Sequence, residues 1–344
     1  MRTLLLDRGQ TAQAGRIIRR GGLVVFPTET VYGLGANAFD GEACLRIFAA
    51  KGRPADNPLI VHIASVSMLD GVAAETEEAA RRLFAAFSPG PLTVILPRAS
   101  HIPDAVTAGL PTVGVRIPSH PVAQALLDAA GVPVAAPSAN LSGRPSPTDF
   151  ETAVEQMSGR ANAVLDGGAC EHGLESTIVR VEAEKVRVLR EGAVTREMIA
   201  EVLWAEGQEI AIAGIEGPGG TGQEEPPSEA IAAPAPGMRH AHYQPRARVV
   251  AVESEEVPEA LARILEDPRE SVGYIGFQAP RGAPVERLAE IVRPADPEDY
   301  ARRLYRAFYG FDAAGCTTVV AELPAPRGIG RALRDRLRRA SGIG

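Results

Sequence analysis

Residues 23–37 read LVVFPTETVYGLGAN and place a short apolar run directly before a polar, glycine-containing segment. The apolar run is typical of a buried strand, and α/β sheets gather ligands where such strands end. Thr28, Thr30 and Tyr32 could bond a small polar substrate there, while the two glycines would allow the backbone to approach it closely. Judged locally, a polar turn with a capping threonine explains the segment equally well.

Further apolar runs alternate with amphipathic helical patterns up to about residue 205, which predicts an α/β domain. The runs begin near residues 23, 59, 92, 113 and 133, and two more, near 177 and 186, are spaced as a hairpin. Hairpin-like neighbours beside helical crossovers predict a mixed sheet. Asp40 is expected to cap one helix, and Thr148 with Glu151 predicts a capping box at another.

Residues 206–246 lose this periodicity and are rich in Gly, Pro and Glu, as flexible linkers are. We expect a linker whose end could act as an active-site flap. Residues 247–344 alternate strand and helix again, which predicts a smaller, Rossmann-like α/β domain after the catalytic domain at 1–205. No G-x-G-x-x-G follows a strand there, so dinucleotide binding is unsupported.

The composition limits the classes of protein that the chain can belong to. With 344 residues, 45% of them hydrophobic, it can bury two domain cores. A formal net charge of −7 argues against a general nucleic-acid coat. No apolar run approaches the roughly 20 residues that span a bilayer, so we expect a cytoplasmic protein without a membrane partner. Three cysteines, far apart, favour neither a disulfide framework nor a metal site.

Lysine is rare in this chain, and Lys51 and Lys185 are its only examples. Lys51 and Arg53 lie at the predicted end of a helix, where an ammonium and a guanidinium could reach phosphate oxygens. Cations in this position often merely complement the helix dipole. His62 sits among aliphatic residues, where a core histidine with one hydrogen bond is the usual explanation.

Two later segments add polar candidates. Arg116, on the predicted strand VGVRI, could hold a carboxylate or phosphate, and a structural ion pair would look the same. The loop after the run near 133 is dense in hydroxyls and amides ahead of a helix, which suits phosphate bonding, although half of them would be turn residues by default. These loop residues are Ser138, Asn140, Ser142, Ser146 and Thr148, and Ser176 and Arg190 follow around the predicted hairpin.

The sequence contains no G-x-S-x-G, H-E-x-x-H, P-loop or protein-kinase motif. Its candidate residues are hydrogen-bond donors and cations rather than nucleophiles. This profile predicts a reaction in which a bound small molecule attacks ATP while the protein supplies positioning and charge stabilisation.

Seven segments, taken in order, resemble the YrdC-like domain of the two-domain threonylcarbamoyl-AMP synthase family. They are FPTETVYGLG, KGRPADNPLIVHI, SPGPLTVILP, VGVRIPSHP, APSANLSGRPSPT, GLESTIV and VLREG. APGMRHAHYQP and the final GIGRALRDRLRRAS resemble the longer members of that family. The resemblance implies a twisted mixed sheet with helices, followed by the smaller Rossmann-like domain.

The resemblance also implies an activity, that of an L-threonylcarbamoyladenylate synthase, a nucleotidyltransferase. Such an enzyme makes threonylcarbamoyl-AMP and pyrophosphate from L-threonine, bicarbonate and ATP with Mg²⁺, and needs no tightly bound organic cofactor. A downstream tRNA threonylcarbamoyl transferase would then use the product to form threonylcarbamoyladenosine in tRNA.

The same resemblance implies roles for individual residues. Lys51 and Arg53 would be catalytic. ATP would contact Lys51, Arg53, Asn57, Thr112, Ser138, Asn140, Ser146, Arg190 and Tyr243. L-threonine would be surrounded by Thr30, His62, Arg116, Ala136 and Ser176. Tyr243, together with His242, would close the mouth of the site as part of the flap and exclude water.

Two alternatives stay open. YrdC-like domains also occur in carbamoyltransferases of hydrogenase maturation, but this sequence shows neither their zinc-finger nor their acylphosphatase segments. An RNA-binding or ribosome-assembly module could use the arginine-dense segment 331–339, although such a helix is more often a solvated face. A weak RNA contact is compatible with the synthase as well. The sequence does not indicate whether the second domain orients the linker, binds a partner or mediates dimers.

Overall fold

The structure is a computed structural model and describes residues 2–182, 185–204, 211–212, 243–280 and 285–342. Most of the predicted linker, including His242, therefore lies outside the described residues. Among the residues that are described, no helix is both long and apolar enough to cross a membrane.

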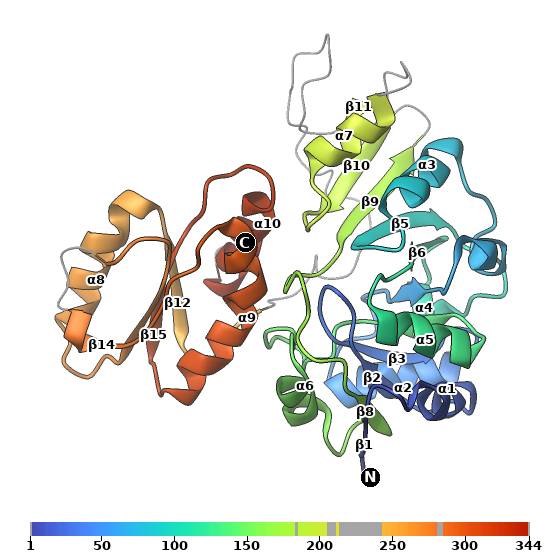
Figure 1. Ribbon diagram of the computed structural model, residues 1–344, viewed down its shortest axis with the longest axis horizontal. Helices are drawn as coiled ribbons and strands as arrows, with labels where there is room; N and C mark the ends of the chain where they lie inside the picture. The colour runs from blue at the N-terminus through green and yellow to red at the C-terminus, as the bar shows by residue number, and fades with distance from the viewer. Residues whose placement is uncertain (1, 183–184, 205–210, 213–242, 281–284, 343–344) are drawn as a thin grey trace.

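A mixed sheet of 11 strands runs through the first domain (Figure 1). In spatial order its strands are β1 (Leu4–Leu6), β8 (Ala163–Leu165), β2 (Val24–Phe26), β3 (Gly33–Asn37), β7 (Val134–Ala136), β4 (Ile60–His62), β6 (Thr112–Arg116), β5 (Leu92–Pro97), β9 (Thr177–Glu182), β10 (Lys185–Arg190) and β11 (Ala211–Ile212). Parallel and antiparallel pairs both occur, so the prediction of a mixed sheet is confirmed. Every predicted apolar run forms a strand, and β9 and β10 pair as the predicted hairpin.

The interpretation of residues 27–37 as one polar turn is wrong in its second half. Gly33–Asn37 forms β3, antiparallel to β2, with Phe26 opposite Gly33. A side chain at Gly35 would place its Cβ 2.7 Å from Val134 and 2.9 Å from the Phe26 ring, so the strand needs glycine for close packing. Only residues 27–32 are left to connect β2 to β3.

The helices of the first domain are α1 (Thr11–Arg19), α2 (Gly41–Lys51), α3 (Glu78–Phe87), α4 (Asp104–Thr107), α5 (Pro121–Ala130), α6 (Phe150–Met157) and α7 (Arg196–Trp204). Asp40 caps α2 by accepting a hydrogen bond from the Ala43 amide, as predicted. The predicted capping box of α6 is wrong, because Asp149 is the N-cap and accepts from the Thr152 amide at 2.8 Å. That carboxylate does what was expected of the Thr148 hydroxyl.

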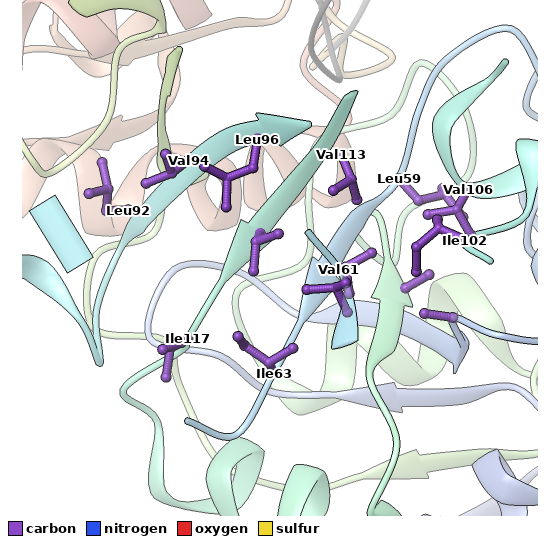
Figure 2. Close-up of a cluster of buried hydrophobic side chains, with 14 of the residues drawn as sticks. Leu59, Val61, Ile63, Leu92, Val94, Leu96, Ile102, Val106, Val113 and Ile117 are labelled. Atoms are coloured by element: carbon purple, nitrogen blue, oxygen red, sulfur yellow. The ribbon is translucent and has the colours of Figure 1, made fainter. Parts of the chain in front are cut away.

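Aliphatic side chains fill the core beneath the sheet, and Figure 2 shows one part of it. Val61 of β4, Val94 of β5 and Val113 of β6 are buried there together with Val106 of α4. Each such side chain contributes about 1.5–3 kcal/mol when fully buried. This packing holds the ends of β4 and β6, which carry His62 and Arg116, on a rigid support.

The second domain contains a four-stranded parallel sheet in the order β12 (Arg248–Val252), β15 (Thr318–Glu322), β13 (Val272–Ile275) and β14 (Leu288–Val292). Its helices are α8 (Val257–Leu265), α9 (Pro297–Ala313) and α10 (Gly330–Ala340). The prediction of a smaller parallel α/β domain is confirmed, with the last strand inserted between the first and the second. In Figure 1, α9 and α10 lie on the side that faces the first domain and α8 lies on the far side.

Candidate active site

A cavity of about 710 Å³, part of which is open to solvent, lies in the first domain where the connection 27–32 meets the loops after β7 and β8. The lining residues are Thr28, Thr30, Val31, Gly33, Lys51, Arg53, Ile60, His62, Arg116, Ala136, Pro137, Ser138, Asn140, Ser142, Glu175, Ser176, Arg190 and Tyr243. All but three of the residues with a predicted contact to ATP or L-threonine therefore lie together in this wall.

Those three are Asn57, Thr112 and Ser146. Ser146 lies behind the wall and donates a hydrogen bond to Glu175 at 2.6 Å. Thr112 begins β6, four residues before Arg116 on an extended strand, and is not part of the wall. Asn57 is buried close to Arg53, whose guanidinium lies 3.4 Å from the Asn57 carbonyl oxygen. Their contacts with ATP stay predictions.

Lys51 ends α2 and is only 2% exposed. Its ammonium donates to the carbonyl oxygen of Ser138 at 2.6 Å and to that of Asn140. Burial lowers the pKa of Lys51 well below its usual value, Arg53 lowers it further, and Glu175 opposes both effects. The ammonium was expected to reach phosphate as a mobile point charge, but in this structure it fastens the loop after β7 to α2 at the cavity wall.

Arg53 and Asn57 carry buried polar atoms that lack partners among the described residues. These atoms are Nε of Arg53 and both Nδ2 and Oδ1 of Asn57. Burial lowers the pKa of Arg53 to about 10. A buried polar atom without a partner costs about 1–3 kcal/mol. A polar ligand or a water molecule can complete these hydrogen bonds.

Arg116 forms a buried ion pair with Glu29, with 2.7 Å between its Nη2 and the Glu29 Oε1. Burial would raise the pKa of Glu29, but the charge and hydrogen bond of Arg116 outweigh it and hold that pKa below its usual value. Of the two readings left open for Arg116, the structure shows the ion pair, and Arg116 also lines the cavity. Glu29 was missed, although it is the single carboxylate within the polar segment PTETV.

His62 is buried beside Arg116, and its Nδ1 lies 3.1 Å from the carbonyl oxygen of Ile60. Burial, and after it the positive charge of Arg116, lower the pKa of His62 to about 3. The imidazole is therefore neutral at physiological pH and can bond a ligand without adding charge. His62 is thus buried as a core histidine would be and also lines the cavity, and its contact with L-threonine stays a prediction.

Four hydroxyl groups of the wall, those of Thr28, Thr30, Ser138 and Ser176, bond one another or neighbouring groups. Thr28 and Thr30 are 2.8 Å apart, and Ser176 lies 2.8 Å from Thr93. Ser138 donates to the Asn140 side chain at 2.5 Å. Tyr32, expected near the substrate, instead donates to the Gly168 carbonyl oxygen at 2.8 Å and is not part of the wall. None of these wall hydroxyls forms the hydroxyl–histidine pair of an activated nucleophile.

Glu175 was not predicted from the sequence, and it joins the wall to the second domain. Its carboxylate accepts hydrogen bonds from Tyr305 of α9 at 3.0 Å and from Arg336 of α10 at 3.1 Å. Tyr243 also lines the cavity and stacks on Tyr305, with ring centroids 5.5 Å apart. Arg336 is 0% exposed, so the interpretation of segment 331–339 as a solvated face is wrong at this residue.

Arg190 of β10 lines the cavity near Glu175. Its Nε donates to the carbonyl oxygen of Ser176 at 3.0 Å, and its Nη2 donates to the hydroxyl of that residue at 3.1 Å. With Lys51, Arg53 and Arg116 it makes four cationic side chains around one cavity. Such a site is suited to an anionic ligand with several oxygen atoms.

Fold and site together define a class: an α/β protein whose cavity, lined by fixed cations and hydroxyl groups, is suited to a small anionic molecule. Family models divide the chain in the same way. One described as Telomere recombination matches residues 16–192, and one described as Threonylcarbamoyl-AMP synthase, C-terminal domain, matches residues 194–342. The chain belongs to the threonylcarbamoyl-AMP synthase family, as the sequence resemblance predicted.

Individual relatives are similar over nearly their whole length. The threonylcarbamoyl-AMP synthase of Pyrococcus abyssi is 40% identical over 96% of this chain and 93% of its own, and that of Bacillus subtilis is 38% identical over 97% and 93%. The crystal structure of P. abyssi Sua5 complexed with L-threonine superposes with a TM-score of 0.85 at 37% identity, covering 100% of this chain and 98% of that one.

Proposed function

We propose that this protein makes threonylcarbamoyl-AMP and pyrophosphate from L-threonine, bicarbonate and ATP, as a nucleotidyltransferase. The observation that carries the proposal is the cavity wall, in which buried cations and unpartnered polar atoms surround a space without an activated nucleophile. Relatives named for this synthase, and the L-threonine in the P. abyssi Sua5 crystal structure, support it. Neither the hydrogenase-maturation nor the RNA-binding alternative has comparable support.

L-threonine would occupy the part of the cavity bounded by Thr30, His62, Arg116, Ala136 and Ser176. Arg116 would attract its carboxylate, and the neutral imidazole of His62 would accept or donate one hydrogen bond. Glu29 already pairs with Arg116, which keeps the guanidinium in place before substrate arrives.

ATP would occupy the part of the cavity next to Arg53, Asn57 and Arg190. The unpartnered atoms of Arg53 and Asn57 would bond the nucleotide, and Ser138 and Asn140 line the same side. Asn57, Thr112 and Ser146 would contact ATP only after a small movement, because none of the three is in the wall. Lys51 would act mainly by holding the 138–140 loop, with its charge adding to the field on the phosphates.

The proposed reaction needs no covalent enzyme intermediate. The threonine amine forms a carbon–nitrogen bond with bicarbonate and releases water, which gives a carbamate. A carbamate oxygen then attacks the α-phosphorus of ATP, and the bond to the β-phosphate oxygen breaks so that pyrophosphate leaves with its electron pair. Arg53 and Arg190 offset the charge on the phosphate oxygens, and Tyr243 covers the site against water.

Mg²⁺ would accompany ATP rather than occupy a cage of protein ligands. Among the described residues, no three His, Cys, Asp or Glu side chains gather as a metal-binding cluster. Glu175, the carboxylate of the wall nearest to Arg190, is engaged by Arg336, Tyr305 and Ser146. This donor set fits an ion held by the nucleotide phosphates, which is the usual mode for Mg²⁺, where it neutralises charge.

The product is a mixed anhydride that reacts readily with water, so it should be consumed soon after it forms. We infer that a separate tRNA threonylcarbamoyl transferase takes it up, and that this happens in the cytoplasm. A weak RNA contact by this protein stays a proposal. The arginines of α10 offer little free charge for it, since Arg331 pairs with Glu197 at 2.6 Å and Arg334 pairs with Glu253.

Pyrophosphate release from purified protein tests the proposed function. It should require L-threonine, bicarbonate and ATP together, and should proceed without RNA. Arg53→Ala and Lys51→Ala should each lower kcat/KM by about 10²–10³-fold, because they remove transition-state charge stabilisation or its support. Lys185→Ala, which changes the other lysine of the chain, is the matched control. Undiminished turnover in both site variants would contradict the assigned roles.

A further inference from the structure

The second domain contacts the active-site wall of the first domain at several points. Val31 and Leu174 belong to one buried apolar cluster with Tyr243 and with Tyr305 of α9. Gly173 (φ +75°) lies so close to α9 that a Cβ there would be 2.5 Å from the Arg302 Cα. The connection 27–32 and the loop that carries Glu175 and Ser176 are therefore packed directly on the second domain.

A second group of contacts holds the loop after β7. Tyr309 of α9 donates to the Pro145 carbonyl oxygen at 2.7 Å. Arg144 forms an ion pair with Asp312 of the same helix at 2.7 Å. This loop also contains Ser138 and Asn140, which line the cavity. One helix of the second domain thus fixes two loops of the wall.

Glu175 presents an electrostatic problem that the first domain does not solve by itself. It is a buried carboxylate in a wall built to receive an anion, and left uncompensated it would repel the ligand or draw Arg190 towards itself. Arg336 approaches it from α10, behind the wall, and is not among the residues that line the cavity. Neutralisation from behind leaves the cations of the wall to act on the ligand.

We propose that Arg336 and Tyr305 are positioning residues: from the second domain they hold and neutralise Glu175, and so keep Arg190 and the Ser176 loop in place for the nucleotide. This inference rests on the proposed function. It assigns the second domain a direct part in forming the active site, through a contact between residues 161 positions apart in the chain.

The geometry of Arg336 supports more than a general stabilising role. Its Nε bonds Glu175, its Nη1 bonds Asp335 at 2.6 Å, and its Nη2 bonds the Glu191 carbonyl oxygen at 3.0 Å. Glu191 directly follows Arg190. The same guanidinium lies 5.4 Å from the centre of the Tyr243 ring. One side chain therefore fixes the carboxylate, the end of β10 and the aromatic cover together.

Titration of Glu175 gives a readout that general destabilisation does not change. Burial would raise its pKa, but the charges of Arg336 and then Arg190, with the Ser146 hydrogen bond, hold that pKa below its usual value. The charged or titratable groups that face Glu175 or these partners are Lys51, Arg190, Tyr243, Tyr305, Asp335 and Arg336. Without Arg336 the pKa of Glu175 should rise, so the acid limb of the rate profile should move towards neutral pH.

The test compares full-length variants in threonine-dependent pyrophosphate release across pH, with unfolding curves for each. Arg336→Ala should lower kcat/KM by about 10–100-fold and shift the acid limb upward, while Arg336→Lys should restore the position of that limb. Arg331→Ala is the matched control, because it removes another ion pair between α10 and the first domain, with Glu197, away from the cavity. It should retain the wild-type rate.

A double variant shows whether Arg336 acts through Glu175. Arg336→Ala combined with Glu175→Gln should lose less than the product of the two single losses, because both changes break the same ion pair, whereas fully multiplied losses would overturn the proposal. So would an Arg336→Ala protein that melts earlier but keeps the wild-type rate and pH profile. If Arg336→Ala does not fold, Tyr305→Phe removes one hydroxyl only, and an unchanged rate in it would overturn the proposal.

Two measurements separate this proposal from the proposed function. Wild-type protein that releases no threonine-dependent pyrophosphate would refute the synthase and leave the domain contact to be judged separately. The affinity for ATP, measured by calorimetry in the same variants, tests the domain contact separately, because binding does not depend on turnover. Equal ATP affinity in wild type, Arg336→Ala and Tyr305→Phe would then overturn the positioning role.

Discussion

His62 illustrates how burial alone can decide the charge of a residue. The native imidazole has a pKa of about 3, whereas an unfolded chain protonates it near pH 6.5. Between these values the unfolded state binds a proton that the native state does not bind. The free energy of unfolding therefore falls as pH decreases from about 6.5, and each pH unit costs up to about 1.4 kcal/mol from this residue.

Replacement of His62 should remove that contribution. In urea unfolding between pH 7 and pH 5, His62→Gln should show a shallower loss of stability than wild type, by up to about 1.4 kcal/mol per pH unit below pH 6.5. Burial also lowers the pKa values of His120 and His172, and these residues contribute equally to the pH dependence of stability in both proteins. His101→Gln, at an exposed position, is the control for loss of a histidine. Identical slopes in wild type and His62→Gln would refute this account.

At the residue scale, the sequence predicted the cavity wall well and its supporting contacts poorly. Thr30 and Ser138 stand in short polar segments next to strands, where the local context makes them recognisable. His62, Arg116 and Arg190 lie on strands, and only the family resemblance assigned them to the site. Glu29 lies in the same segment as Thr30, and Glu175 directly precedes Ser176, but the sequence does not show which cation each carboxylate pairs with. Arg336 lies on the apolar stripe of α10 with Leu333, Leu337 and Ala340, so periodicity alone indicates that it is buried, but not that Glu175 is its partner.

At the element scale, the loop that carries Glu175 depends on a glycine. Gly173 has a φ of +75° and touches the backbone of α9, so alanine there would meet both conformational strain and a clash. Gly168 has a φ of +78°, and a Cβ added there would have no neighbouring atom within 4 Å, so alanine would meet strain alone. The two positions separate the two effects.

Gly173→Ala should therefore cost more stability than Gly168→Ala. Strain should cost each variant about 1–2 kcal/mol, and the clash should add about 1–3 kcal/mol to Gly173→Ala. Chemical unfolding measures both, and pyrophosphate release should fall further in Gly173→Ala because α9 and the loop are pushed apart. Equal stability and equal rates in the two variants would argue against close packing of α9 on the loop.

Some strands of the first domain could be predicted from the sequence, and others could not. Seven apolar runs predicted seven strands, because buried strands of a mixed sheet need continuous aliphatic surface. β1 and β8 were missed because their apolar runs, LLL and AVL, are shorter than the runs LVVF, LIVHI and PVAA that predicted the equally short strands β2, β4 and β7. β3 was missed because its glycines, which the packing against Phe26 and Val134 requires, are the residues least typical of strands.

At the scale of the whole molecule, Asp312 ties the two domains and the start of the second sheet together. Its carboxylate accepts from the Arg246 and Ala247 amides at 2.8 and 3.0 Å and pairs with Arg144. Asp312 is 7% exposed, and Arg144 is 23% exposed. Loss of this carboxylate would leave the amides of Arg246 and Ala247 and the partly exposed guanidinium of Arg144 without their acceptor.

Asp312→Ala should lower the free energy of unfolding by about 2–3 kcal/mol and the Tm by several degrees. Scanning calorimetry on the full-length protein measures this, and the calorimetric trace should also broaden as the domains become less coupled. Asp267→Ala, which removes an exposed ion pair with Arg269 inside the second domain, should leave the trace unchanged. A wild-type trace for Asp312→Ala would show that this contact contributes little.

The position of Arg336 in the chain has a consequence for biosynthesis. Domains of a growing polypeptide tend to fold in the order in which they are made, so the first domain can collapse around Glu175 while α10 has yet to be translated. During that interval the carboxylate has no counter-ion from α10, and the nucleotide pocket is unfinished. If Arg336 has the proposed role, the wall around Glu175 is completed only after the helix Gly330–Ala340 has been made, and ATP binding should be delayed until then.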